Sequence, residues 1–120
     1  MGMKLFDSEL RVMDILWEKG EVRAKEIADY LKKEVGWSRS TTYTVIKKCI
    51  DKGAIKRIDP NFICRPLISK SEVQNYETNE LIDKMYDGAA DQLIANLLGR
   101  NDLSTEEIKR LRELVKELER

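Results

Sequence analysis

The 120-residue sequence predicts a mainly α-helical protein with one small β-hairpin. Three observations predict this class. Apolar residues recur at helical spacing in most segments of the chain. Glycine and proline are sparse, with 6 and 2 residues, so few segments are broken. Only residues 54–58 and 62–68 read as strands, and they flank a turn of residues at positions 59–61 that tolerate tight backbone angles.

The pattern changes from strand to helix at residues 69–71, which divides the chain into two predicted domains, residues 1–70 and 71–120, and the charge differs between them. The first has 15 Lys/Arg and 10 Asp/Glu, and the second has 7 and 12, although the net charge is zero. Residues 38–65 contain seven basic residues and only two acidic ones. A clustered excess of this kind is typical of a protein that binds a polyanion, because an ordinary solvated surface mixes the two signs.

Composition excludes several classes of protein. No apolar run approaches the roughly 18 residues of a membrane span, so we expect no membrane partner and a cytoplasmic location. The absence of histidine removes the commonest general base and metal ligand. We therefore expect no enzyme, no catalytic residue, no metal and no cofactor. Cys49 and Cys64 have neither a metal spacing nor a disulfide framework, and they are interpreted as packing residues.

Two helices are predicted before the basic segment. The first, residues 7–19, is apolar nearly all round and should be central; its apolar residues are Leu10, Val12, Met13, Ile15, Leu16 and Trp17. Residues 21–22 are interpreted as a connection. The second helix, residues 23–34, has one apolar stripe at the i, i+3, i+4, i+7 positions Ala24, Ile27, Ala28 and Leu31. A brief turn with glycine at 35–37 joins it to the next helix, which predicts a helix-turn-helix.

The third helix carries the candidate recognition surface. Ser38 is a suitable N-cap and Gly53 a suitable stop, being free to adopt positive φ. One face is apolar, with Val45, Ile46, Cys49 and Ile50, and the opposite face carries hydroxyl and ammonium groups. The second helix of a helix-turn-helix lies in the major groove. The residues predicted to contact DNA are Arg39, Ser40, Thr41, Tyr43, Thr44, Lys47 and Lys48. Tyr43 lies at the edge of this face, where it either contacts a base or sugar or simply packs.

A basic hairpin follows the third helix directly. Residues 54–58 alternate apolar and basic side chains like an edge strand, and Pro66 limits the returning strand to an edge. Lys56, Arg57 and Arg65 are predicted to contact phosphates, although exposed arginines on a sheet edge also deter aggregation. Helix, glycine and hairpin in this order predict that the N-terminal domain is a winged helix-turn-helix.

The second domain is predicted to contain three helices, at residues 71–86, 89–98 and 104–118. Asp87 and Gly88 break the first, Gly99 caps the second, and Ser104 with Glu107 forms a capping box that opens the third. Their apolar stripes have little to cover them within one chain, so they predict a homodimer. The predicted dimer contacts are Leu81, Met85, Leu93, Ile94, Leu97, Ile108, Leu111, Val115 and Leu118.

Several segments in this order resemble the penicillinase repressor family, which includes the methicillin-resistance repressor. They are Glu9, Val12, Met13, Ile15, Leu16 and Trp17, then residues 40–44 with Lys47 and Lys48, and then residues 52–57, 66–69, 86–88 and 102–104. The resemblance covers nearly the whole chain. It implies a dimeric winged-helix repressor that holds a resistance operon off until the repressor is cleaved.

The sequence departs from the family pattern in two places. Phe6 and Arg23 stand where the family usually has a capping Ser or Thr, so we expect Asp7 or Ser8 to cap the first helix. The family's cleavage site, an asparagine followed by phenylalanine, aligns with Asn96-Leu97, where only the asparagine matches. The resemblance therefore implies a signalling protease as a partner, while the departure leaves cleavage by it open.

Two functions remain at this point. The leading one is a homodimeric transcriptional repressor that binds double-stranded DNA. The two-fold symmetry of such a dimer implies an inverted-repeat operator. The alternative is a winged helix that serves only as a protein-protein interaction module, since the same fold does both. An interaction module should present an apolar outward face on the third helix, and here that face contains Ser40, Thr44, Lys47 and Lys48.

Overall fold

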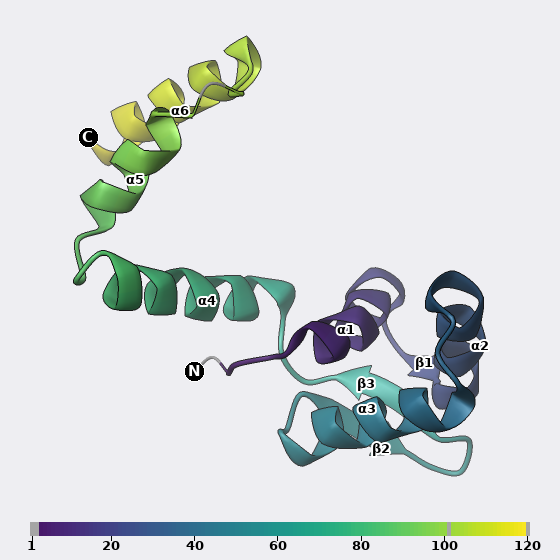
Figure 1. Cartoon of the computed structure of the whole chain (residues 1–120). Coiled ribbons are helices and arrows are strands. Elements are labelled where there is room, and N and C mark those ends of the chain that lie inside the picture. The colour runs from purple at the N-terminus through teal and green to yellow at the C-terminus, as the bar shows by residue number, and fades with distance from the viewer. Residues whose placement is uncertain (1–2, 101, 120) are drawn as a thin grey trace. The chain divides into compact units, whose positions relative to one another are not determined.

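The computed structural model describes residues 3–100 and 102–119. Its elements are α1 (Asp7–Lys19), β1 (Val22–Arg23), α2 (Ala24–Val35), α3 (Arg39–Asp51), β2 (Ile55–Ile58), β3 (Ile63–Pro66), α4 (Lys70–Met85), α5 (Ala90–Leu98) and α6 (Thr105–Leu118). Figure 1 shows α1, α2 and α3 with the small sheet, followed along the chain by α4, α5 and α6. The predicted mainly α-helical class with a winged helix-turn-helix is confirmed.

The chain separates into two compact units, residues 1–78 and 79–120. The division falls inside α4, because the first turns of this helix belong to the N-terminal unit, where Val73 is buried. Trp17 of α1 supports the same junction, as its Nε1 donates to the carbonyl of Ile68 at 2.9 Å. The assignment of residues 1–70 to DNA binding and of 71–120 to dimerisation stays a prediction.

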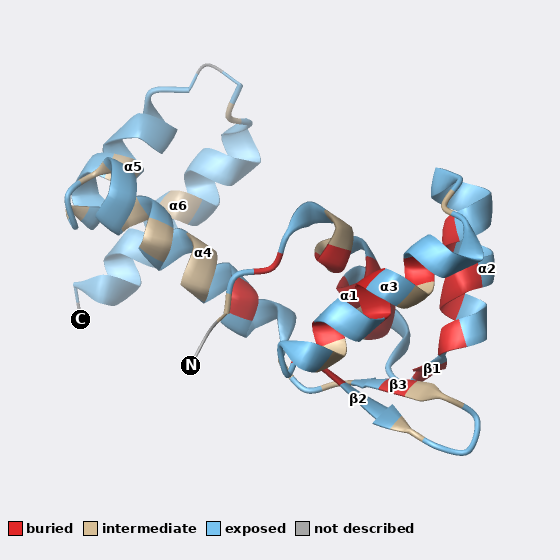
Figure 2. Ribbon diagram, turned by 60° about the horizontal axis from the view of Figure 1, so that its bottom comes forward, coloured by how far each residue is buried: buried red, intermediate tan, exposed pale blue. Residues whose placement is uncertain are grey.

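The N-terminal unit contains the apolar core. Its largest fully buried apolar side chains come from α1, α2, α3 and β2, and they are Met13, Leu16, Ile27, Ile46, Ile55 and Val12. Figure 2 shows the buried residues concentrated in these elements. The predicted inner face of α3 is confirmed, because Val45, Ile46 and Cys49 are buried. Burial on this side fixes which face of α3 points to solvent.

The ends of α3 follow the sequence signals. The Ser38 hydroxyl accepts a hydrogen bond from the backbone N–H of Thr41 at 3.2 Å, as an N-cap should. Gly53 has φ of 83°, a conformation that side chains with a Cβ rarely adopt. The chain can therefore turn directly from α3 into β2, which keeps the hairpin beside the helix.

The start of α1 differs from the prediction. Asp7 is already helical and Phe6 is the N-cap residue, so the expected cap at Asp7 or Ser8 was wrong. The cap has no side-chain acceptor, but the carboxylate of Glu9 accepts from the backbone N–H of Phe6 at 2.7 Å. The backbone N–H of Phe6, which has no carbonyl partner within the helix, is thereby bonded by a side chain of the first turn.

The sheet has three strands in the order β1-β3-β2, one more than predicted. Residues 21–22 were interpreted as a connection, yet Val22 and Arg23 form a two-residue strand opposite Cys64 and Ile63 of β3. A strand this short carries no period that the sequence could reveal. The sheet closes the helix-turn-helix by joining the segment before α2 to the hairpin.

The position of β3 was also predicted wrongly, because it is the central strand and not an edge. Pro66 pairs with Ile55 of β2, whereas β1 reaches only as far as Cys64. The side of Pro66 turned away from β2 therefore faces no strand, and the missing N–H of proline breaks no ladder there. Proline is therefore at an edge only at this end of β3, where the strand pairs with β2 alone.

The C-terminal unit contains no buried residue on α5 or α6 among the residues the structure describes. The predicted capping box is confirmed, since Glu107 N donates to the Ser104 hydroxyl at 3.1 Å and Ser104 N donates to the Glu107 carboxylate at 3.0 Å. The hydrogen bond from the Ser104 backbone N–H lowers the pKa of the Glu107 carboxyl. Gly99 caps α5, but in a right-handed conformation with φ of −78°. Within residues 3–100 and 102–119, no helix has the length and apolarity to cross a membrane.

Candidate nucleic-acid interface

The outward face of α3 is polar and accessible. Ser40, Thr44, Lys47 and Lys48 are all exposed, on the side opposite the buried residues of the helix. The Thr44 hydroxyl donates to the carbonyl of Ser40 at 2.9 Å. Its single proton is therefore engaged, and its lone pairs and methyl group remain for a ligand. Such a group can accept from an adenine or cytosine amino group or contact a thymine methyl.

Hydroxyl groups gather at the beginning of α3. The Ser38 hydroxyl lies 3.2 Å from that of Ser40 and 2.9 Å from that of Thr41, and all three residues are exposed. They surround the N-terminal turn, whose backbone amides carry partial positive charge. Arg39 extends from the same turn. This end of the predicted recognition helix therefore combines hydroxyls, a helix terminus and a guanidinium, which are the groups that bind phosphates.

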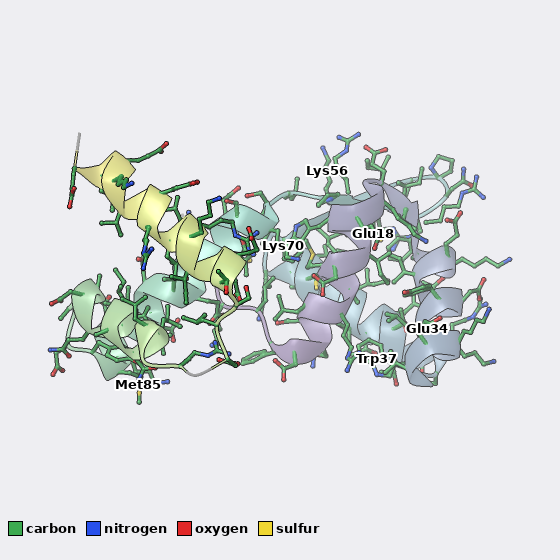
Figure 3. All side chains as sticks on the ribbon, turned by 90° about the horizontal axis from the view of Figure 1, so that it is seen from above. Glu18, Glu34, Trp37, Lys56, Lys70 and Met85 are labelled. Carbon is green, nitrogen blue, oxygen red and sulfur yellow. The ribbon has the colours of Figure 1, made fainter. Side chains whose placement is uncertain are left out.

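The cations of the interface fall into two sets. Lys47, Lys48 and Lys56 are exposed, and none of them forms an ion pair with a carboxylate in the described residues. Figure 3 shows Lys56 at the outer edge of the N-terminal unit. Arg39 pairs with Asp29 at 3.3 Å, and Arg65 pairs with Glu21 through its Nε. The three lysines therefore offer charge that the protein itself does not neutralise.

The hairpin and α3 meet at Phe62. The Tyr43 ring packs edge-to-face on the Phe62 ring, with centroids 5.7 Å apart, and the guanidinium of Arg57 lies 3.8 Å above the Phe62 centroid. Arg57 Nε also donates to Asp59 at 3.0 Å. The ring of Tyr43 thus packs, one of the two roles considered for it, while its contact with DNA stays a prediction. Sequence reasoning did not single out Phe62, whose role depends on residues from three elements.

One basic residue of the cluster is turned inward. Lys52 Nζ lies 2.6 Å from Glu9 Oε1, donates to the carbonyl of Lys4 at 3.0 Å, and sits 4.4 Å above the Phe6 ring. Glu9 is only 1% exposed. Lys52 therefore ties the end of α3 to the beginning of α1, and its charge is not available on the outward face. The sequence spacing from Phe6 to Glu9 could have indicated the capping bond, but nothing in it indicates Lys52 as the partner.

The two thiols are buried in the core, as predicted for packing residues. Burial, together with the negative charge of Glu9, raises the pKa of the Cys49 thiol to about 12. Burial raises the pKa of the Cys64 thiol to about 11. Both thiols are therefore protonated and unreactive at neutral pH. In the described part of the chain, no group of three or more His, Cys, Asp or Glu side chains is placed to hold a metal.

The predicted dimer contacts lie on an accessible apolar surface. Met85 is 66% exposed and Leu118 is 84% exposed, and Leu81, Ile94, Leu97, Ile108 and Val115 are also exposed. Leu93 and Leu111 are half-buried. The structure adds Leu98 and Leu114, which the prediction omitted although they share the helical spacing of their neighbours. A groove of about 360 Å³ between α5 and α6 is lined by Leu97, Leu103, Leu111, Leu114, Arg100, Glu107 and Arg110.

Comparison with known proteins places these features in a family. The chain is 28% identical to the penicillinase repressor of Bacillus licheniformis over 116 residues, which is 95% of this chain and 91% of that one. It is 30% identical to the methicillin resistance regulatory protein MecI of Staphylococcus aureus strain N315 over 114 residues, 93% of each chain.

Solved structures resemble the N-terminal part. The solution structure of the DNA-binding domain of the repressor BlaI is similar with a TM-score of 0.54 and 29% identity, covering 60% of this chain and 93% of that one. The Bacillus licheniformis BlaI monomeric form in complex with the blaP half-operator is similar with a TM-score of 0.52 and 28% identity, covering 60% and 90%. A sequence model of the penicillinase repressor family matches residues 5–117, and this chain therefore belongs to the penicillinase repressor family.

Proposed function

We propose that this protein is a DNA-binding transcriptional repressor whose helix α3 reads the major groove of its operator. The observation that carries the proposal is the outward face of α3, where the buried opposite face directs two hydroxyls and two lysines to solvent, the lysines without acidic partners among the described residues. The relative solved with a half-operator supports it, because the two chains share the N-terminal fold at 28% identity. The names of the relatives favour an antibiotic-resistance operon as the target.

In this proposal the residues divide by task. Ser40, Thr44 and Lys48 lie where a groove-bound α3 faces base edges, and hydrogen bonds at those positions specify sequence. Lys56, Arg57 and Arg65 of the hairpin contact phosphates, which fix the position of the protein on the duplex without reading it. Lys47, Arg39 and Thr41 join the phosphate contacts on either side of the helix, and Tyr43 adds a contact at its edge.

A salt titration tests DNA binding. The five cations assigned to phosphates, on each of two bound chains, should give a slope of log K against log salt of about −9, since each neutralised phosphate contributes about −0.9. Fluorescence anisotropy with a labelled operator duplex measures this slope. Lys47→Gln should reduce its magnitude by about 0.9 per bound chain, whereas Lys33→Gln, an exposed lysine of α2 outside the interface, should leave it unchanged. A slope near zero for the unmodified protein would remove the DNA-binding proposal.

We further propose that the protein acts as a homodimer held by its C-terminal unit. The support is the apolar surface on α5 and α6, which includes Ile94, Leu97 and Val115 and which one chain leaves exposed. A two-fold dimer would place two α3 helices in major grooves one turn, about 34–36 Å, apart or a multiple of it. The operator should therefore be an inverted repeat.

Substitution in α5 tests the dimer. Leu97→Gln removes a buried contact from each protomer, and at roughly 1.5–3 kcal/mol for each leucine the dissociation constant should rise by at least about a hundredfold. Asn96→Gln, next to it on the same helix and also exposed, should have little effect. Sedimentation over a range of concentrations measures both. Equal dimer strength in the two variants would show that α5 lies outside the interface.

Inactivation by a signalling protease at Asn96-Leu97 is the last part of the proposal. Both residues are exposed, but they lie within α5, so a protease can bind the bond only after the helix unwinds locally. A cut there would separate α6 from the rest of the dimerisation surface. Mass spectrometry of the repressor recovered from induced cells measures the site. A repressor that stays intact while its operon is expressed would exclude cleavage as the switch.

A further inference from the structure

Phe62 connects three elements of the N-terminal unit through separate contacts. Its carbonyl accepts from the backbone N–H of Ala24 at 2.9 Å, the first residue of α2. Its ring receives the edge contact of Tyr43 from α3 and the guanidinium of Arg57 from β2. Its φ of 47° lies in the left-handed region, which costs energy for a residue other than glycine. These contacts maintain that conformation at the start of β3.

The contact with Phe62 orients one particular cation. The Arg57 guanidinium lies over the ring, with its Cζ 3.8 Å from the ring centroid, and its Nε donates to Asp59 at 3.0 Å. Within the described residues no partner engages its two Nη atoms, so they form the free edge of the group. Two parallel N–H donors on one edge match the geometry of a phosphate. Arg57 is therefore ordered before any ligand arrives.

The adjacent Lys56 provides the contrast within the same strand. It is exposed and has no ion-pair or ring partner in the described part of the chain. A long side chain of that kind loses rotamer freedom when it binds a phosphate, and that loss lowers its contribution to affinity. Arg57 has already lost most of this freedom, so its phosphate contact should be the stronger of the two.

We propose that Phe62 is a positioning residue for operator binding, which aligns Arg57 on the hairpin with the recognition helix α3. The inference rests on the proposed DNA-binding function. Phe62 itself touches no DNA: the Tyr43 contact holds its ring against α3, and the ring acts on DNA binding only through the Arg57 guanidinium that lies over it. Its effect is on affinity for every sequence alike, because Arg57 contacts phosphate and not bases.

Variants of Phe62 test the proposal by affinity and salt slope together. Phe62→Leu keeps an apolar side chain but removes the aromatic face, and operator affinity should fall about two- to fivefold for each bound chain, as expected for an exposed cation–π contact. The salt slope should stay unchanged, because Arg57 still neutralises its phosphate. Phe62→Tyr keeps the ring and should retain the affinity. Arg57→Lys, at an exposed position where folding is not at risk, should show the same loss as Phe62→Leu with the same slope.

A double substitution separates positioning from a general structural role. In an Arg57→Gln background, Phe62→Leu should have no further effect on affinity, while Arg57→Gln alone lowers the slope by about 0.9 per chain. Urea unfolding confirms that each variant is folded. The proposal is overturned if Phe62→Leu loses as much affinity in the Arg57→Gln background, if Phe62→Tyr fails to retain binding, or if Arg57→Lys binds like the unmodified protein. Absence of salt-dependent binding by the unmodified protein would instead overturn the DNA-binding function itself.

Discussion

Replacing Lys52 by methionine should destabilise the protein much more than replacing Glu9 by glutamine. The two side chains form an ion pair 2.6 Å long, but their burial is unequal, because Glu9 is 1% exposed and Lys52 is 30% exposed. Methionine at 52 leaves a buried carboxylate with one remaining donor, the backbone N–H of Phe6. Glutamine at position 9 leaves the Lys52 ammonium without a carboxylate, but this ammonium can still contact water.

The magnitudes follow from these environments. Removing one partner of a buried ion pair, so that the other charge stays buried and unpaired, costs about 3–5 kcal/mol of unfolding free energy. For Lys52→Met we expect about 3 kcal/mol, because Lys52 is partly solvated. Glutamine at position 9 keeps the acceptor Oε1 for both Phe6 N and Lys52, while Oε2 of Glu9 has no hydrogen-bond partner among the described residues that the substitution could remove. Its cost should be about 1 kcal/mol. The Lys52 substitution in the Glu9→Gln background should also cost about 1 kcal/mol, since no charge remains to be stranded.

Urea unfolding at fixed protein concentration measures these differences in the free energy of unfolding. A fixed concentration is needed because dimerisation would add to the stability of the folded state. A third variant, Lys33→Met on the exposed surface of α2, controls for the loss of a lysine as such and should change stability little. Equal costs for Lys52→Met and Glu9→Gln, or additive costs in the double variant, would refute the argument from unequal burial.

Three further outcomes are expected. Thr44→Ala should reduce the preference for operator over random DNA, whereas Arg65→Gln should weaken both alike, and competition titrations distinguish them. Glu21→Gln should strengthen DNA binding up to about fivefold for each bound chain by releasing Arg65, an effect that must vanish in the Arg65→Gln background. A thiol reagent at neutral pH should label Cys49 and Cys64 only when urea unfolds the protein, because their pKa values are raised by burial. Rapid labelling of the folded protein would contradict this.

The helices and their inner faces could be predicted because each is specified locally. The apolar period of α3 placed Val45, Ile46 and Cys49 inside, and the caps Ser38 and Gly53 fixed where the helix starts and where the chain turns. These signals lie within a few residues of the feature that they determine. The outward face of α3 could be inferred as the side opposite these buried residues. The candidate DNA contacts on α3 could therefore be predicted from the sequence as well.

The sheet could not be predicted in full because its pairing is not local. Val22 pairs with Cys64 more than forty residues away, and two residues have no alternation to detect. Pro66 was taken to make the whole of β3 an edge strand. The pairing of β3 with β1 ends at Cys64, however, so Pro66 lies beyond it and does not prevent β3 from being central. Phe62 was overlooked for the same reason, since its partners Tyr43 and Arg57 belong to other elements.

The charge count shows most clearly what the fold adds to the sequence. Seven cations in residues 38–65 predicted a polyanion site, but a count treats them as equal. Acidic residues of the first thirty positions pair with three of them, Glu9 with Lys52, Glu21 with Arg65, and Asp29 with Arg39. Only one of these pairs is buried; the two exposed ones are weak enough for a phosphate to displace the carboxylate. Asp59 pairs with a fourth cation, Arg57, so among the described residues the unopposed charge of this segment is that of Lys47 and Lys48 on α3 and of Lys56 on β2.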